Sequence, residues 1–268
     1  MKKQLIIVSI IILFLGVGFT GCFGPLSTDY FHESYVVSEQ TILKLTNING
    51  NVEITGWDGN NVTVYAVKKS SYGKEELDKI KIEVNTIGNY LNIETKYTGL
   101  SITHGSVDYN IKVPRTIHIE SVTSSNGAIQ IIDSKGDVKT LSSNGAIIIN
   151  NVDGYVSAET SNGHIEVKGT AGINDIHTSN GAITVEVADF RDNVSIATSN
   201  AGITVYLNPS LNAVIDMRTS NSKINIEGIS LNVELLEDTH VLGSLGINGN
   251  RLDIYTSNAN IHLINLIV

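Results

Sequence analysis

Apolar and polar residues alternate along most of this chain, which is the pattern of short β-strands that each bury one face. Before residue 115 the alternating segments are residues 43–45, 52–54, 62–67, 80–84, 91–95 and 107–113. Only residues 74–79, rich in Lys and Glu, indicate a turn of helix. The pattern therefore predicts an all-β protein, and 268 residues are enough for one large β domain.

From residue 123 onward the alternation repeats around a corner of sequence Ser-Asn-Gly or a close variant. Three and five positions after each corner Asn lie apolar residues, nearly all β-branched, as in Ile129 and Ile131. The first three intervals between these Asn residues are 18 residues long, and the next two are 20 and 21. The corner residues are Asn126, Asn144, Asn162, Asn180, Asn200, Asn221 and Asn258. A short, fixed period indicates stacked repeats.

Two folds fit such a repeat. Asn-Gly between alternating segments is typical of a type I′ hairpin, which would give an antiparallel meander. The rival is a single-domain β-solenoid, a parallel β-helix-like stack of short strands with about 18 residues per coil and a spacing of ~4.8 Å. Because the offsets are kept over consecutive turns, we favour the solenoid. The seven corner Asn residues would then form a structural ladder rather than a ligand site, each amide bonding to the coils above and below.

The regularity of the pattern divides the expected domain, residues 41–268, into three parts. Residues 115–229 are the regular coils, residues 41–114 are N-terminal strands and a cap, and residues 230–268 are a C-terminal cap. Caps are expected because the open ends of a solenoid would otherwise expose unpaired strand edges. Asn200, Asn221 and Asn258 lack a following Gly, so the regularity of the last coils stays open.

The N-terminus indicates where the protein resides. Lys2 and Lys3 precede an apolar run that ends in Phe-Thr-Gly-Cys22, which is typical of a secretory signal peptide over residues 1–21. The end of this leader resembles a lipobox, which implies that Cys22 carries lipid and anchors the chain at the extracytoplasmic face of the cell membrane. Residues 22–40 are then a tether. The alternative is an uncleaved anchor, although the run is shorter than the ~20 residues of a spanning helix.

The repeated Thr-Ser-Asn-Gly-x-Ile, the preceding Val113-Pro114 and the opening Asn47-Ile-Asn-Gly-Asn-Val-Glu-Ile carry a family resemblance. Over about residues 41–268 the chain resembles the toastrack domains, a family of adhesin-like domains of unknown function. The resemblance implies a solenoid-like stack of strands displayed outside the membrane. Because no activity is established for the family, it assigns no catalytic residues.

Charge and candidate chemistry restrict the function further. Without the leader, 16 basic and 27 acidic residues leave a net charge of −11. The sequence has no basic patch of the kind that binds nucleic acid, so we expect no nucleic-acid partner. Acidic β-rolls bind calcium at Gly-Gly-x-Gly-x-Asp turns, which this chain lacks, so we expect no metal and no cofactor. If coils stack in register, Glu159 and His177 share an outer column with Asp175 nearby. We interpret this group, and His164 with Glu166, as a solvated polar face rather than a catalytic site.

These observations predict a cell-surface lipoprotein with a non-catalytic, adhesin-like domain that binds an unknown protein or surface polymer. Two alternatives are an extracytoplasmic component of an envelope-stress sensing system, with which toastrack domains are associated, and a self-associating structural scaffold. A surface hydrolase would need a pocket at Glu159 and His177. Asn61 and Asn193 lie in Asn-x-Ser/Thr sequons and are candidate glycosylation sites.

Overall fold

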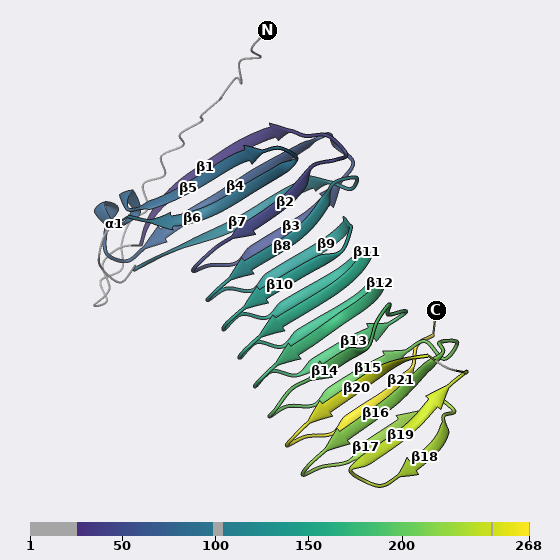
Figure 1. Cartoon of the computed structure of the whole chain (residues 1–268). Coiled ribbons are helices and arrows are strands. Elements are labelled where there is room, and N and C mark those ends of the chain that lie inside the picture. The colour runs from purple at the N-terminus through teal and green to yellow at the C-terminus, as the bar shows by residue number, and fades with distance from the viewer. Residues whose placement is uncertain (1–25, 99–103, 248, 268) are drawn as a thin grey trace.

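Strands lie side by side along an elongated stack that makes up nearly the whole molecule (Figure 1). The structure is a computed structural model, and it describes residues 26–98, 104–247 and 249–267. The leader and Cys22 lie outside the described residues. The one helix within them is α1 (Lys74–Asp78), which confirms the helical turn expected at residues 74–79. The all-β fold class is confirmed.

Each central coil has one strand segment before and one after an Asn-containing corner. The strands are β8 (His118–Ser124), β9 (Ile129–Lys135), β10 (Val138–Ser142), β11 (Ile147–Thr160), β12 (Ile165–Thr178), β13 (Ile183–Val187), β14 (Val194–Ala197) and β15 (Ile203–Leu207). β11 and β12 each run on from one coil into the next. Successive coils pair in parallel, with Ile129, Ile147 and Ile165 in one register. This register confirms a β-solenoid of 18 residues per coil and excludes the antiparallel meander for these coils.

The strand segments before the corners form one sheet, and those after the corners form a second sheet. The core lies between these two sheets and is filled by the inward-facing side chains, which occupy every second position along each strand. Along the second sheet, Ile147, Ile165 and Ile183 are each no more than 1% exposed. Burial of one such side chain contributes roughly 1.5–3 kcal/mol. Because identical β-branched side chains stack on one another at the strand spacing, the sequence repeat and the packing repeat are the same repeat.

The turn that closes three of the central coils uses left-handed backbone at one position. Asp133, Asn151 and Gly169 occupy equivalent places 18 residues apart, with φ values of 57°, 55° and 59°. Asp and Asn tolerate this conformation better than other side chains, and Gly adopts it without strain. The Asn151 amide donates to Asp133 at 2.5 Å, and this bond, with the Arg115 guanidinium, lowers the pKa of the Asp133 carboxyl.

The N-terminal part contains seven strands: β1 (Ser27–Val36), β2 (Ile42–Thr46), β3 (Val52–Trp57), β4 (Asn61–Ser70), β5 (Ile80–Ile87), β6 (Tyr90–Tyr97) and β7 (Gly105–Pro114). β2 lies between β6 and β8, and β3 lies between β7 and β9, so the first coil of the chain is not the first of the stack. β1 and β5 form the outer strands of the two sheets, paired antiparallel with β4 and β6.

β1 changes one expectation from the sequence. Residues 22–40 were predicted to form a tether, but residues 27–36 pair along their whole length with β4. The alternation in β1 is hidden because Glu33 lies on the same face as Phe31 and Tyr35, where its carboxylate accepts a hydrogen bond from the Tyr35 hydroxyl. A charged residue on the half-buried face made this segment look irregular.

The C-terminal part contains six strands: β16 (Ala213–Thr219), β17 (Ile224–Glu227), β18 (Asn232–Leu236), β19 (His240–Leu245), β20 (Asn250–Thr256) and β21 (Ile261–Asn265). β20 lies between β14 and β16, and β21 lies between β15 and β17. Residues 230–268 were predicted to form a C-terminal cap. The last coil of the chain, β20 and β21, lies instead inside the stack. The hairpin of β18 and β19, antiparallel to β16, forms the end.

Candidate interaction surfaces

Eight asparagines stack along one exposed edge of the solenoid, at its corners. Seven of the eight side-chain amide nitrogens donate to the amide oxygen of the neighbouring Asn, at 2.6–2.8 Å, and that of Asn49 at the end of the column donates to the Gly105 carbonyl. In stacking order the column is Asn49, Asn126, Asn144, Asn162, Asn180, Asn200, Asn258 and Asn221. Because the amides bond to one another, the column holds coils in register rather than offering free groups to a ligand.

The Ser-Asn-Gly repeat predicted seven of these residues but not Asn49. A signal was present, since Gly50 follows Asn49, and Val52 and Ile54 lie at the repeat's apolar offsets. It was obscured by Asn47, which occupies the position where other coils carry Ser or Thr. The Asn47 amide there donates to the Val107 carbonyl at 2.8 Å.

A second column of hydroxyl groups lies behind the asparagines, and all its members except the partly exposed Ser142 are buried. The Thr160 and Thr178 hydroxyls each donate at 3.0 Å to the corner carbonyl of the neighbouring coil, on Gly145 and Gly163. The same bond recurs along the stack. The column consists of Ser124, Ser142, Thr160, Thr178, Thr198, Thr256 and Thr219. The corner is thus a structural element, in which hydroxyl, amide and backbone all bind the next coil.

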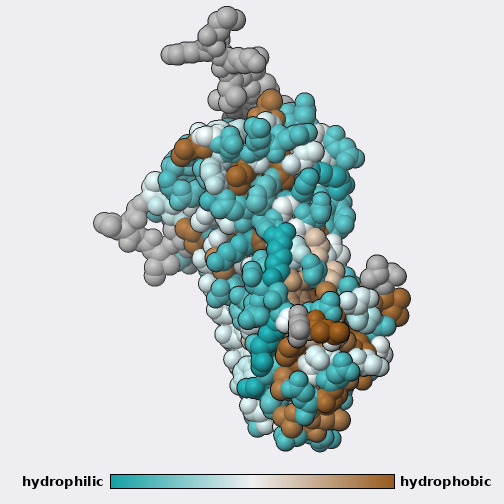
Figure 2. Space-filling view, turned by 45° about the vertical axis from the view of Figure 1, so that its right-hand side comes forward, coloured by the Kyte–Doolittle hydropathy of each residue, from teal (hydrophilic) through white to brown (hydrophobic). Residues whose placement is uncertain are grey.

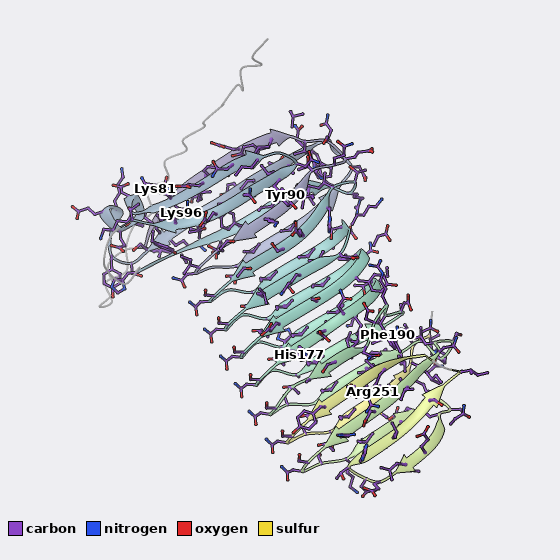
Figure 3. All side chains as sticks on the ribbon, in the orientation of Figure 1. Lys81, Tyr90, Lys96, His177, Phe190 and Arg251 are labelled. Atoms are coloured by element: carbon purple, nitrogen blue, oxygen red, sulfur yellow. The ribbon has the colours of Figure 1, made fainter. Side chains whose placement is uncertain are left out.

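The acid and histidine group predicted from the repeat lies on an open sheet surface. Glu159 and His177 are direct neighbours on the outer face of β11 and β12. With Asp175 and Lys139 they line a depression of about 160 Å³, and His177 is marked in Figure 3. Among the described residues, no cluster of three or more His, Cys, Asp or Glu side chains is placed to hold a metal ion.

His164 and Glu166 are separated from that group by the corner and lie with the second strand of the coil. Glu166 forms an ion pair with Lys168 of the same strand at 2.8 Å. The structure therefore brings Glu159, His177 and Asp175 together, and leaves His164 and Glu166 apart from them.

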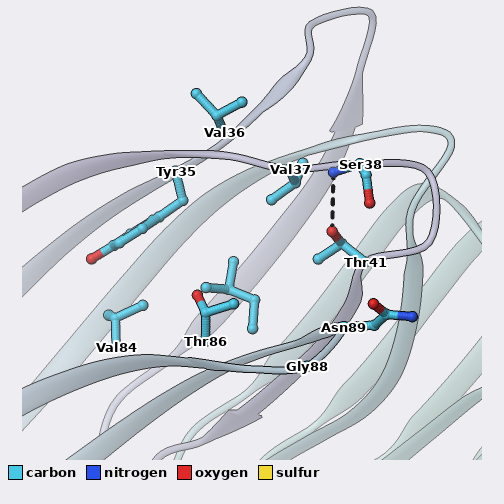
Figure 4. Close-up of a pocket in the computed structure, with 10 residues that line it drawn as sticks. Tyr35, Val36, Val37, Ser38, Thr41, Val84, Thr86, Gly88 and Asn89 are labelled. Atoms are coloured by element: carbon cyan, nitrogen blue, oxygen red, sulfur yellow. Dashed lines mark hydrogen bonds between the residues drawn. The ribbon is translucent and has the colours of Figure 1, made fainter. Parts of the chain in front are cut away.

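A groove of about 230 Å³ lies at the N-terminal end, between β1 and the hairpin of β5 and β6 (Figure 4). Its walls include Tyr35 and Val84, and the Ser38 amide donates to the Thr41 hydroxyl at one end, at 3.1 Å. Burial, together with the neighbouring Glu33 carboxylate, raises the pKa of the Tyr35 hydroxyl. The groove is the gap between the two outermost strands of the sheets.

A buried carboxylate fastens the inserted coil to its neighbours. Asp216 on β16 is 2% exposed and accepts hydrogen bonds from Arg218 at 2.7 Å and from His240 at 3.1 Å. Arg251 on β20, marked in Figure 3, also binds Asp216 and contacts Asp253 at 2.7 Å. Three strands, β16, β19 and β20, thus meet at one carboxylate, which indicates a structural role for the cluster.

The C-terminal end of the stack carries an apolar surface that the sequence pattern did not predict. Apolar side chains gather over β17, β18 and the segment between them, at the lower end of the molecule in Figure 2. Val233 and Leu236 are exposed, and four further side chains are only partly buried: Ile224, Ile226, Ile229 and Leu231. We call these six residues the apolar tip.

The two sequons lie at different depths. Asn61 begins β4, and its backbone carbonyl accepts a hydrogen bond from the Trp57 indole at 3.0 Å. Asn193 is exposed before β14, and its side-chain oxygen accepts from the Arg251 amide at 2.9 Å. Glycosylation at either site stays a prediction.

In the part of the chain that the structure describes, no helix has the length and apolar character needed to span a membrane.

Fold and surfaces together define a non-globular, all-β repeat domain with flat faces and two different ends. No protein-family model matches the chain. No curated protein matches it either. Among solved structures, it is similar to a "putative adhesin" from Bacteroides fragilis, with 11% identity, a TM-score of 0.45, and coverage of 89% of this chain and 97% of that one.

Two further solved structures are similar over most of their length. A "putative cell adhesion protein" from Clostridium sporogenes is 14% identical, with a TM-score of 0.38 and coverage of 89% of this chain and 99% of that one. A "putative lipid binding protein" from Parabacteroides distasonis is 12% identical, with a TM-score of 0.37 and coverage of 91% and 98%. Identity and TM-score are low for all three.

Proposed function

We propose that this protein is a cell-surface lipoprotein whose β-solenoid is a non-catalytic, adhesin-like interaction domain. The observation that carries the proposal is where the chain enters the fold. β1 is the outermost strand of its sheet at the N-terminal end, so a lipid at Cys22 would hold the stack by that end. Both sheet faces and the apolar tip would then stay available to partners outside the membrane.

A binding role suits these surfaces better than catalysis does. Glu159, His177 and Asp175 lie over an open depression of about 160 Å³, whereas reaction sites are normally concave and exclude water. The corner Asn amides are engaged in the ladder and are not available to activate a substrate. What the domain presents instead is a long, rigid framework with a distinct end.

The proposed membrane localisation is tested by measuring the intact mass and membrane partition of the native protein beside a Cys22→Ser variant. We expect the native protein to begin at Cys22 with added lipid mass and to remain with the membrane, and the variant to be released. A matched Ser27→Ala variant, changed beyond the leader, should behave as the native protein does. A native chain that keeps residues 1–21 and stays soluble inside the cell would contradict the proposal.

A further inference from the structure

The apolar tip is an uncovered end of the hydrophobic core. Ile224 and Ile226 on β17 hold the inward positions that Ile183 and Val185 hold on β13, where exposure is 1% or less. On β17 the same positions are partly exposed. No further strand of the second sheet follows β17 among the described residues, so the core is open on this side.

β18 shows the same opening more strongly. Its register places Val233 opposite Gly243 and Leu236 opposite Val241, and the two β19 residues are buried. Val233 and Leu236 therefore point to the core side of the sheet, yet they are 48% and 70% exposed. Core-facing apolar side chains with this exposure indicate a surface that another segment covers.

The opposite end of the stack is covered in part by a helix. There α1 packs against β1, β4 and β5, and Leu77 and Ile80 are no more than 2% exposed. Tyr35 and Val84 are only partly buried there and line the groove of Figure 4, but neither is as exposed as Val233 and Leu236, so the larger opening of the core is at the C-terminal end.

The backbone of β18 is free to accept a strand. Among the described residues β18 pairs with β19 alone, so the amides and carbonyls of its other edge have no strand partner. Free edges of this kind bind extended segments through main-chain hydrogen bonds, and the pockets between alternate side chains give selectivity.

The charge around the tip indicates what kind of segment fits. Residues 224–239 contain Glu227, Glu234, Glu237 and Asp238 but no Lys or Arg. Of these, Asp238 is near Lys223 at 3.7 Å. An acidic rim around apolar side chains complements a segment that alternates basic and apolar residues.

We propose that the C-terminal end of the stack binds an extended, basic strand of a partner protein. The strand adds to the free edge of β18, lays its apolar side chains over Val233 and Leu236, and places its cations against the acidic rim. This deepens the proposed function and rests on it, because an N-terminal anchor keeps the tip away from the membrane. A second copy of this chain is disfavoured as the occupant, since two acidic rims would repel each other.

The test uses the full chain in nanodiscs of neutral phosphatidylcholine, so that a basic probe does not bind the lipid. The probe is a fluorescein-labelled peptide of sequence Lys-Val-Lys-Val-Lys-Val-Lys, followed by fluorescence anisotropy. We expect saturable binding that weakens about tenfold or more in Leu236→Lys. The matched control is Ile87→Lys, which changes an apolar strand residue that is 69% exposed at the other end and should bind normally.

Two further probes separate strand addition from charge attraction. A peptide with Pro in place of the central Val cannot extend the sheet and should bind about tenfold more weakly. Hydrogen exchange of the β18 amides should slow when the Lys-Val peptide is bound. Salt of about 0.5 M should weaken binding by screening the rim.

Three results would overturn the proposal. They are the absence of saturable binding, equal binding of the Pro peptide, and equal binding to Leu236→Lys and Ile87→Lys. A concentration-dependent dimer that Leu236→Lys abolishes would replace the partner strand with a second copy. Intact mass and membrane partition, measured on the same preparation, report on the surface-lipoprotein function independently of any of these results.

Discussion

At the scale of single residues, each position of the repeated corner has a separate physical task. The Asn amides join successive coils on the exposed edge, where each bond contributes little because water competes for it. The buried Thr hydroxyls, such as that of Thr178, satisfy corner carbonyls that water does not reach, so their loss costs more. The corner Gly allows the backbones to approach closely. The sequence motif therefore consists of the residues through which each coil stacks on the next.

The close approach at the corner can be tested by adding a methyl group. A Cβ on Gly163 would fall far inside van der Waals contact of the Gly145 carbonyl oxygen, a backbone atom that cannot move aside. Gly163→Ala should therefore destabilise the domain by about 2–3 kcal/mol, measured by urea unfolding. The matched control is Gly202→Ala, whose Cβ would lie 3.5 Å from the Asn260 carbonyl oxygen, an ordinary contact. Equal stability of the two variants would show that the coils do not pack this closely.

A buried tyrosine gives the fold a dependence on alkaline pH. Tyr109 on β7 is 3% exposed, and its hydroxyl lies 2.7 Å from that of Thr95. Burial raises the pKa of Tyr109 to about 12, above the value of about 10 in the unfolded chain. A raised folded pKa means that stability is fully present below pH ~10 and is lost as pH rises toward ~12, because the unfolded tyrosine ionises first.

The corresponding measurement is urea unfolding at pH 9 and at pH 11.5. By linkage, the native protein should lose about 2 kcal/mol through this group as the pH approaches ~12. Tyr109→Phe cannot ionise, so its loss over the same interval should be smaller by that amount. Because Tyr109→Phe also loses the hydroxyl contact with Thr95, the loss in each protein is measured from that protein's own stability at pH 9. Parallel losses in the two proteins would assign the alkaline effect to other groups.

At the scale of elements, both ends of the stack insert a coil out of chain order. β2 and β3 come before β6 and β7 in sequence but lie inside them, and β20 and β21 come last yet lie inside β16 and β17. At each end the inserted coil therefore has a parallel partner on both sides.

The sequence predicted what each coil contains better than which coils are neighbours. Ile129, Ile147 and Ile165 recur at one offset, and that spacing leads directly to the parallel register. The position of Asn258 between Asn200 and Asn221 could not be predicted in this way, because the motif is the same in any order. Neighbour order depends on which edges remain free after the other coils have paired, and that is a property of the whole stack.

The inserted position of the last coil has a consequence for hydrogen exchange. Ile254 on β20 and Leu263 on β21 are no more than 1% exposed and have a parallel partner on each side. Their amides should exchange as slowly as those of Ile176 and Val185 in the central coils, and much more slowly than those of β18. Exchange of β20 and β21 together with β18, in one early-opening unit, would show instead that the chain end is a peripheral cap.

At the scale of the whole molecule, the stack is a spacer with unequal ends. Its Asn column has eight members, so seven strand spacings separate the first and last Asn corners, which is ~34 Å. The chain without its leader carries a net charge of −11 by sequence, which disfavours contact between the faces and anionic headgroups. The sequence alone did not reveal the apolar tip, because residues 224–236 read as ordinary strands. Their exposure follows only from the absence of a further covering strand among the described residues.

This geometry predicts that the molecule stands away from the membrane to which we propose it is anchored. Cys22 is the only cysteine, so once it carries lipid, a thiol introduced elsewhere can be labelled alone. A fluorophore at Ser71→Cys, beside α1 at the N-terminal end, should be strongly quenched by nitroxide-labelled headgroups in reconstituted vesicles. The same fluorophore at Ser230→Cys, in the segment between β17 and β18, should be quenched little, because most of the stack lies between it and the lipid. Both serines are exposed loop residues, so neither substitution should alter folding. Equal quenching at the two positions would mean that the solenoid lies along the bilayer, and the apolar tip would then face lipid rather than a partner strand.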